Sequence, residues 1–223
     1  MKIAAYIDHT FLKQDTTTTD VKNICQEALE YRFAAVCIPP PLVQHAKAAT
    51  RESGIKVATV IGFPFGYSVA RAKLHEAQQA MEDGADELDV VINLVALKSK
   101  AWEYLESEIK FIIDAAHKNN RLVKVIIESG ILTDEEIIQC CELYATAGAD
   151  FLKTSTGYAA VGATLHAVTL MRVHLPEQVQ IKASGGIRTY EFAYQLIEAG
   201  ATRLGCSAGV NIANGQKSPE EGY

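Results

Sequence analysis

The sequence predicts an α/β protein that forms a single (β/α)8 TIM barrel. Short apolar runs alternate with amphipathic stretches along all 223 residues, and no change in composition divides the chain. Runs such as residues 123–127 are largely apolar, as expected for parallel strands covered by helices. Eight such units fit a closed barrel. A doubly wound open sheet is the alternative, but the chain lacks its G-x-G-x-x-G fingerprint.

The expected strands are eight runs of five to seven residues. Each is followed by a helix or a helical turn. In chain order the strands are residues 5–10, 34–38, 56–62, 87–92, 122–128, 151–155, 179–184 and 203–207.

The helices between these strands are predicted by apolar spacing and by capping residues. Leu105, Ile109 and Ile112 lie three or four residues apart, which places them on one helical face. Thr133, followed three residues later by Glu136, forms a capping box that opens another helix. The acidic residues there also meet the positive end of the helix dipole.

An internal repeat supports this series of units. It begins with a glycine that suits the left-handed end of a helix, after which the chain enters a strand. The three copies begin at Gly84, Gly148 and Gly200. Five residues further on, at the same step of three strands, stand Asp89, Lys153 and Gly205.

Composition excludes several classes of partner. Lysine and arginine number 21 against 27 acidic residues, so the formal charge is −6, whereas nucleic acids and anionic membranes require concentrated basic residues. No run of about 18 apolar residues exists, and the first residues become polar too early for a signal peptide. We therefore expect a soluble, cytoplasmic protein that binds small molecules, without nucleic-acid or membrane partners.

Cysteine and histidine residues show no metal-binding spacing. The five cysteines are odd in number and include no C-x-x-C pair, and the six histidines are scattered. The sequence therefore predicts neither a disulfide framework nor a metal site.

Charged residues interrupt strands that should be apolar. Lys124, Lys153 and Lys182 lie within three of them, and Asp8 and Asp89 lie within two others. An unpaired ammonium in the layer between strands and helices would be very costly, so we expect these side chains to face the lumen. One reading is a buried ion cluster that only fills the barrel. The other is a catalytic site, because catalytic groups collect at the carboxyl ends of barrel strands.

The residue types suggest covalent amine catalysis. A lysine attacks a carbonyl only when it is neutral, and both burial and a second ammonium lower its pKa. Lys153 and Lys182 lie on consecutive strands, so one could be the nucleophile and the other could lower its pKa and transfer protons. Asp89 would offset their charge and relay protons through water. This predicts a lysine-based lyase and leaves the substrate open.

Two glycine-rich turns indicate a phosphate site. Residues 184–186 follow the seventh expected strand, and residues 205–209 follow the eighth. Glycines let backbone N–H groups approach an anion closely, and the loops after these two strands often bind phosphate in such barrels.

Residues 151–157 (FLKTSTG) and 181–188 (IKASGGIR) resemble motifs of the deoxyribose-phosphate aldolase family, and the similarity extends from residue 6 to residue 209. The resemblance implies a class I aldolase, a carbon–carbon lyase of deoxyribonucleotide catabolism. It implies that 2-deoxy-D-ribose 5-phosphate is cleaved reversibly to D-glyceraldehyde 3-phosphate and acetaldehyde, without a metal or cofactor.

Barrels of this type often self-associate, so we also expect a homo-oligomer, either a dimer or a tetramer.

The resemblance also implies roles for individual residues. Lys153 would form the Schiff base, and Lys182 and Asp89 would handle proton transfers. Residues expected around the sugar are Asp8, Thr10, Cys37, Lys124 and Thr156. Residues expected around the phosphate are Gly157, Gly185, Gly186, Gly205 and Ser207.

Two alternatives stay open at this point. One is another Schiff-base barrel aldolase, and the other is a non-catalytic barrel that binds a sugar phosphate with its lysines as fixed charges. The catalytic barrel is expected at residues 1–214 and a polar, flexible tail at residues 215–223. Tyr223, the last residue, would either assist protonation at the acetaldehyde carbon or have no role.

Overall fold

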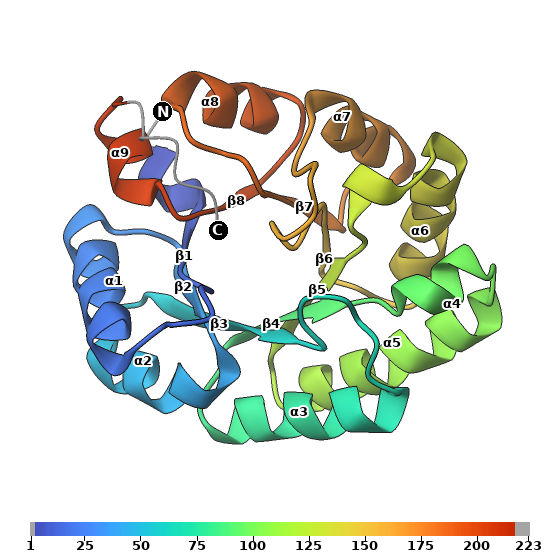
Figure 1. Cartoon of the computed structure of the whole chain (residues 1–223), viewed down its shortest axis with the longest axis horizontal. Coiled ribbons are helices and arrows are strands. Elements are labelled where there is room, and N and C mark those ends of the chain that lie inside the picture. Colours follow the sequence, from blue (N-terminus) through green and yellow to red (C-terminus); the bar gives the residue numbers. More distant parts are fainter. Residues whose placement is uncertain (1–2, 217–223) are drawn as a thin grey trace.

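Eight parallel strands close into a barrel in the computed structural model, which describes residues 3–216 (Figure 1). Consecutive strands are paired, and β8 also pairs with β1, so the predicted (β/α)8 barrel is confirmed and the open sheet is excluded. The strands are β1 (Ile7–Thr10), β2 (Ala35–Ile38), β3 (Lys56–Ile61), β4 (Glu87–Val91), β5 (Leu122–Ile126), β6 (Phe151–Lys153), β7 (Gln180–Ser184) and β8 (Arg203–Cys206).

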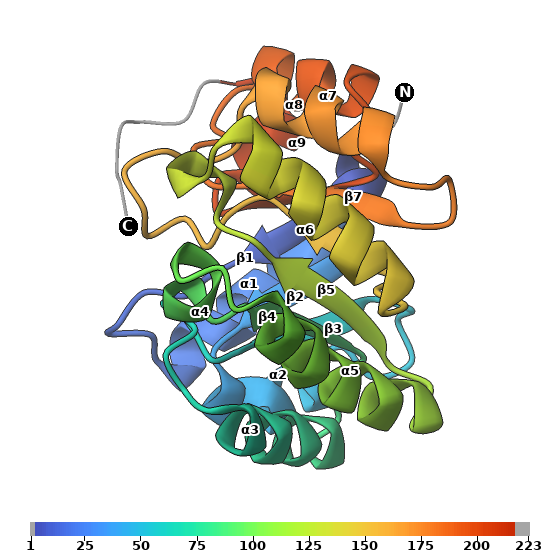
Figure 2. The ribbon, with the colours of Figure 1, turned by 90° about the vertical axis from the view of Figure 1, so that its right-hand side faces the viewer.

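Helices surround the strands on the outside of the barrel (Figures 1 and 2). Three short 3-10 helices add to them at η1 (Ile3–Tyr6), η2 (Pro40–Leu42) and η3 (Ser129–Ile131). The α-helices are α1 (Thr18–Tyr31), α2 (Val43–Ala49), α3 (Ala70–Glu82), α4 (Leu94–Lys98), α5 (Trp102–Lys118), α6 (Asp134–Thr146), α7 (Leu165–His174), α8 (Tyr190–Glu198) and α9 (Gly209–Ala213). Within the described range, no helix is long and apolar enough to cross a bilayer.

The local signals in the sequence act as predicted. Thr133 caps α6 by accepting from the N–H of Glu136, whose side chain accepts in turn from the N–H of Thr133. Gly84, Gly148 and Gly200 have φ angles of 106°, 89° and 115°, a region that glycine enters without steric cost. Each of these glycines therefore turns the chain from a helix into the next strand.

Several strands are shorter than the sequence predicted. Residues 5 and 6 belong to η1, so the first strand begins at Ile7. The fifth strand was expected to continue to Glu128 but ends at Ile126, and Glu128 itself has the left-handed φ of 55°. Apolar runs do not show where strand pairing stops, because residues just beyond a strand are buried as deeply as those within it.

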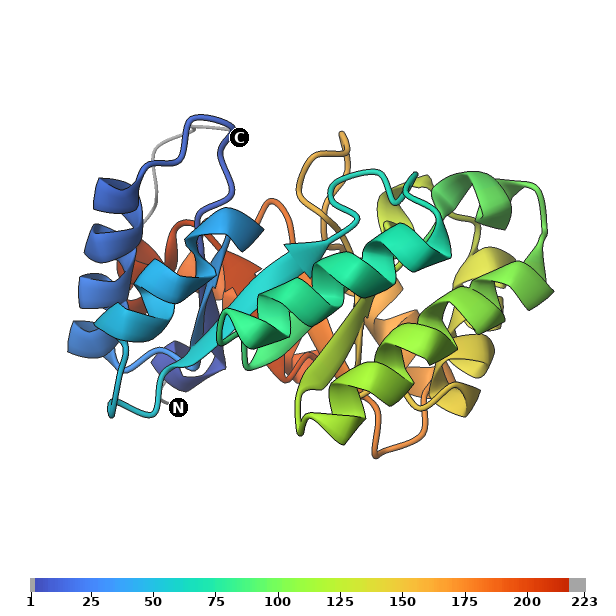
Figure 3. The ribbon, with the colours of Figure 1, turned by 90° about the horizontal axis from the view of Figure 1, so that it is seen from below.

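The mouth of the barrel is formed by segments that follow the strands. In Figure 3 the segments after β1, β3 and β6 project from the same end. The buried apolar side chains of strands and helices pack together around the barrel, whereas the strand lysines and aspartates meet one another inside it. The prediction that these charges face the lumen is confirmed.

Candidate active site

Seven charged side chains meet inside the barrel, and strand register brings them together. Asp89 stands beside Lys124, Lys153 beside Lys182, and Lys182 beside Arg203 on neighbouring strands. Alternate residues of a strand face the same side, so Glu87 joins Asp89 on the inner face of β4. The cluster consists of Asp8, Glu87, Asp89, Lys124, Lys153, Lys182 and Arg203.

Six of these side chains form a closed ring of alternating charge. Around the ring each cation contacts two carboxylates within 3 Å, and each carboxylate contacts two of the ring's cations within that distance. The ring consists of the contacts Asp89–Lys124 (2.8 Å), Lys124–Glu87 (2.6 Å), Glu87–Arg203 (2.6 Å), Arg203–Asp8 (2.6 Å), Asp8–Lys182 (2.6 Å) and Lys182–Asp89 (2.7 Å). We call it the ion ring.

Lys153 lies outside the ion ring and attaches to it at one point. Its Nζ donates to Oδ2 of Asp89 at 2.8 Å, the same oxygen that accepts from Lys182. Only 2% of Lys153 is exposed. Asp89 therefore holds the two lysines that the sequence predicted to act together.

The two lysines differ in their pKa. Burial lowers the pKa of Lys153; Asp89 opposes this shift and the ammonium of Lys182 adds to it. Burial acts in the same direction on Lys182, but the carboxylates of Asp8 and Asp89 outweigh it and raise its pKa. Of the two, Lys153 is therefore the amine that loses its proton more easily, and Lys182 stays a cation.

The two aspartates are anions. Burial alone would raise the pKa of Asp89, but Lys124, Lys153 and Lys182 outweigh it and hold the pKa well below its usual range. Burial is likewise outweighed at Asp8, whose pKa is lowered by Lys182, Arg203 and Lys124.

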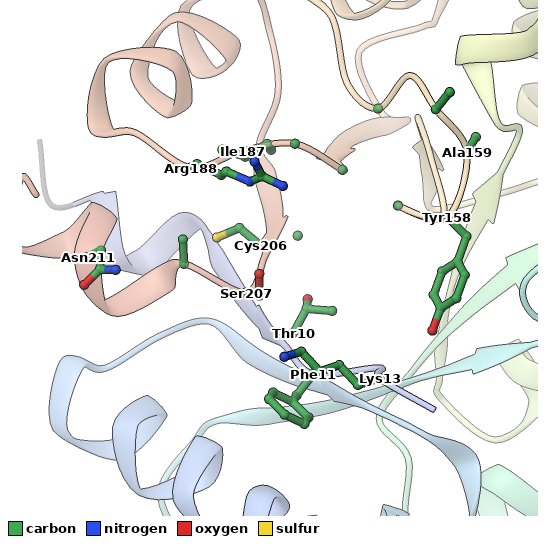
Figure 4. Close-up of a pocket in the computed structure, with 17 residues that line it drawn as sticks. Thr10, Phe11, Lys13, Tyr158, Ala159, Ile187, Arg188, Cys206, Ser207 and Asn211 are labelled. Atoms are coloured by element: carbon green, nitrogen blue, oxygen red, sulfur yellow. The ribbon is translucent and has the colours of Figure 1, made fainter. Parts of the chain in front are cut away.

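A cavity of about 530 Å³ opens at the mouth of the barrel (Figure 4). Its lining includes six of the residues predicted to bind substrate. These are Thr10, Gly157, Gly185, Gly186, Gly205 and Ser207. Gly157, Gly185 and Gly186 have left-handed φ angles, so Gly157 and the turn at residues 184–186 adopt conformations that most residues avoid.

Four other predicted substrate-binding residues do not line this cavity. Asp8 and Lys124 are fully buried in the ion ring, and the buried Cys37 has its Sγ 4.0 Å from Oδ2 of Asp89. Burial raises the pKa of the Cys37 thiol. Thr156 is also buried, and its hydroxyl donates to Glu128. Tyr223 lies outside the described residues.

Sequence reasoning missed several residues of the site. Glu87 and Arg203 complete the ion ring, and each lies two residues before a predicted site residue, Asp89 and Gly205. The two-residue period of a strand was the signal that could have found them. Lys13 and Arg188 line the cavity from the segments after β1 and β7, on opposite sides of it (Figure 4).

Gly205 has a second role besides lining the cavity. A Cβ at this position would lie 2.9 Å from Cβ of Ser184 and 3.0 Å from Cε of Lys182. We expect Gly205→Ala to displace the Lys182 side chain and lower kcat by roughly 100-fold, as misplacing a catalytic group by about 1 Å does. Steady-state kinetics and circular dichroism check this, and a folded variant with wild-type kcat would contradict it.

Among residues 3–216, no group of three or more His, Cys, Asp and Glu side chains is arranged to hold a metal ion.

A barrel with two buried lysines on one aspartate, and a glycine-lined cavity at the carboxyl ends of its strands, fits the class of barrel aldolases. The comparison with known families agrees, because the model of the DeoC/LacD family aldolases matches residues 2–215. The chain belongs to this family, and it is an aldolase, a carbon–carbon lyase.

Within the family the chain is similar to deoxyribose-phosphate aldolases. It is 50% identical to the one from Caldicellulosiruptor saccharolyticus, over 96% of this chain and 97% of that protein. It is also 50% identical to the one from Thermococcus kodakarensis, over 99% of this chain and 98% of that protein. The solved deoxyribose phosphate aldolase from Aeropyrum pernix is 34% identical with a TM-score of 0.89, covering 95% of this chain and 89% of that one.

Proposed function

We propose that the chain reversibly cleaves 2-deoxy-D-ribose 5-phosphate to D-glyceraldehyde 3-phosphate and acetaldehyde through a Schiff base on Lys153. The observation that carries this proposal is the buried amine of Lys153, which shares one oxygen of Asp89 with the amine of Lys182. Burial and the neighbouring ammonium lower the pKa of Lys153. The names of the relatives at 50% identity support the choice of substrate.

In the proposed mechanism the neutral Nζ of Lys153 attacks the aldehyde carbon C1 of the open-chain sugar. Loss of water from the resulting carbinolamine gives an iminium ion. The C3 hydroxyl then loses its proton, the C2–C3 bond breaks, and its electron pair moves into the iminium as D-glyceraldehyde 3-phosphate leaves. Protonation of the remaining enamine at C2, followed by addition of water, releases acetaldehyde and the free amine.

The residues next to Lys153 supply the proton transfers. Lys182 is a cation 2.7 Å from Asp89, so it serves as the proton donor, and Asp89 serves as the anion that balances the iminium. Protons pass between this pair and the substrate hydroxyls through water.

The cavity at the mouth would hold the phosphate. Glycines without side chains let backbone N–H groups approach an anion closely, and Lys13 and Arg188 add positive charge on either side. In this arrangement the phosphate lies above β7 and β8, and the aldehyde end reaches toward Lys153. Asp8, Cys37, Lys124 and Thr156 would then contact the sugar only if the bound substrate opens the packing above them.

Trapping with acetaldehyde and borohydride tests this proposal. We expect the reduced adduct, an ethyl group, on Lys153 and on no other lysine. Both lysines of the ion ring have a raised pKa, and Lys73, whose pKa burial also lowers, is fully buried and paired with Glu108. Peptide mass spectrometry locates the adduct. A barrel that only binds sugar phosphates would give no adduct, and a different aldolase would give one without releasing D-glyceraldehyde 3-phosphate from the proposed substrate.

The proposal extends to assembly and location. The structure from Aeropyrum pernix is described as tetrameric, which supports a homo-oligomer of this chain. The proposed catabolic sugar-phosphate substrate supports a cytoplasmic location for the chain.

A further inference from the structure

The ion ring is electrically balanced without Lys153. Its three cations, Lys124, Lys182 and Arg203, alternate with three carboxylates, so their charges sum to zero. A protonated Lys153 adds one uncompensated positive charge to this buried site, and a neutral Lys153 adds none. The composition of the ring therefore opposes protonation of Lys153.

Arg203 and Glu87 contribute to this balance from a distance. Neither residue lines the cavity at the mouth. Their contact with each other closes the ring between Asp8 and Lys124, and the guanidinium of Arg203 also lies 5.8 Å from the ring centre of Phe151. These residues can influence the reaction only through their charges and through the side chains they hold.

The groups that face Lys153 come from several elements. Asp89 lies on β4, Lys182 on β7 and the Cys37 thiol on β2, and the buried carboxyl of Glu128 follows β5. Because both Asp89 and Lys182 are members of the ion ring, removing a charge elsewhere in the ring changes the electrostatic potential at the amine.

We propose that Glu87 and Arg203 are positioning residues that set the charge balance of the ion ring and thereby keep the amine of Lys153 neutral for attack. This inference rests on the proposed function, because it assigns Lys153 as the nucleophile. It predicts opposite effects for two neighbouring residues that contact each other, whereas a purely structural role predicts the same effect for both.

The test compares charge-neutralising variants at the two positions. Glu87→Gln gives the ring a net positive charge, so the pKa of Lys153 falls and the acid limb of kcat/KM moves to lower pH. Arg203→Gln gives it a net negative charge, so the limb moves to higher pH. We expect shifts of about one pH unit each, the size that a unit charge several ångströms away produces in a buried site.

Conservative variants serve as matched controls. Arg203→Lys and Glu87→Asp keep the charge, so their limbs should stay within a few tenths of a pH unit of the wild type. Glu136→Gln removes a carboxylate of α6 that pairs with Lys98 of α4, outside the barrel, and should not move the limb. Thermal unfolding shows which variants fold. If Arg203→Gln does not fold, the comparison of Glu87→Gln with Glu87→Asp tests the proposal, because only Glu87→Gln should move the limb to lower pH.

A second readout separates this inference from the proposed function. Acylation of Lys153 by acetic anhydride, followed against pH by peptide mass spectrometry, titrates the amine without turnover. Failure of the wild type to form the acetaldehyde adduct would overturn the function. Shifts of equal sign, or no shift, in folded Glu87→Gln and Arg203→Gln would overturn the role of the ring.

Discussion

Lys153→Met is expected to abolish turnover while leaving the fold nearly intact. Methionine is similar in shape to lysine but carries no amine, so no Schiff base forms and the rate falls by roughly 10⁴-fold or more, as when a covalent nucleophile is removed. Because Lys153 contacts the ion ring only at Asp89, the six ring members keep all their contacts with one another. Little stability should therefore be lost.

Two measurements check this expectation. Coupled detection of D-glyceraldehyde 3-phosphate gives the residual rate, and thermal unfolding gives the stability. Lys47→Met, which removes an exposed lysine that pairs with Asp86, is the control for loss of an amine outside the site. If Lys153→Met retained more than a few per cent of wild-type activity, Lys153 would not be the nucleophile.

Lys182→Met is expected to damage both stability and catalysis. Lys182 is fully buried and holds Asp8 at 2.6 Å and Asp89 at 2.7 Å, so its removal opens the ion ring and leaves excess negative charge inside the barrel. Breaking a buried ion pair from one side costs about 3–5 kcal/mol. For a chain of this length that corresponds to a decrease in Tm of roughly 10 °C.

The catalytic effect of the same change has a distinct pH dependence. Without the Lys182 ammonium, only Lys124 still offsets Asp89, so Asp89 raises the pKa of Lys153 and the acid limb of the profile moves to higher pH. Loss of the proton donor lowers the rate by a further 10²–10⁴-fold, the range for general acid–base groups. Calorimetry and a pH–rate profile of the variant measure these effects separately. A stable variant with an unmoved profile would contradict the assigned role of Lys182.

Sequence reasoning was most successful where the signal was local. The capping box at Thr133 and the helix-ending Gly84 depend on residues within a few positions, and the structure confirms both. The lysines at 124, 153 and 182 were assigned to the lumen because a charge in the apolar layer would be costly. The predicted end of the fifth strand was wrong. The strand ends at Ile126, shortly before Glu128 adopts a left-handed conformation, and no apolar pattern indicates such a change of conformation.

The sequence by itself determined the barrel, the inward direction of the strand charges and the lysines available for covalent chemistry, because strand periodicity and the cost of burying charge are local properties. Only the tertiary structure decided which of these lysines has the lowered pKa. The pKa of each lysine depends on how many carboxylates its ammonium contacts. Lys182 contacts two, Asp8 and Asp89, and both lie far from it in the sequence. The two-residue strand period could have placed Glu87 and Arg203 in the lumen, but the closure of the ion ring could not be found from the sequence, since it depends on contacts between β1, β4, β5, β7 and β8.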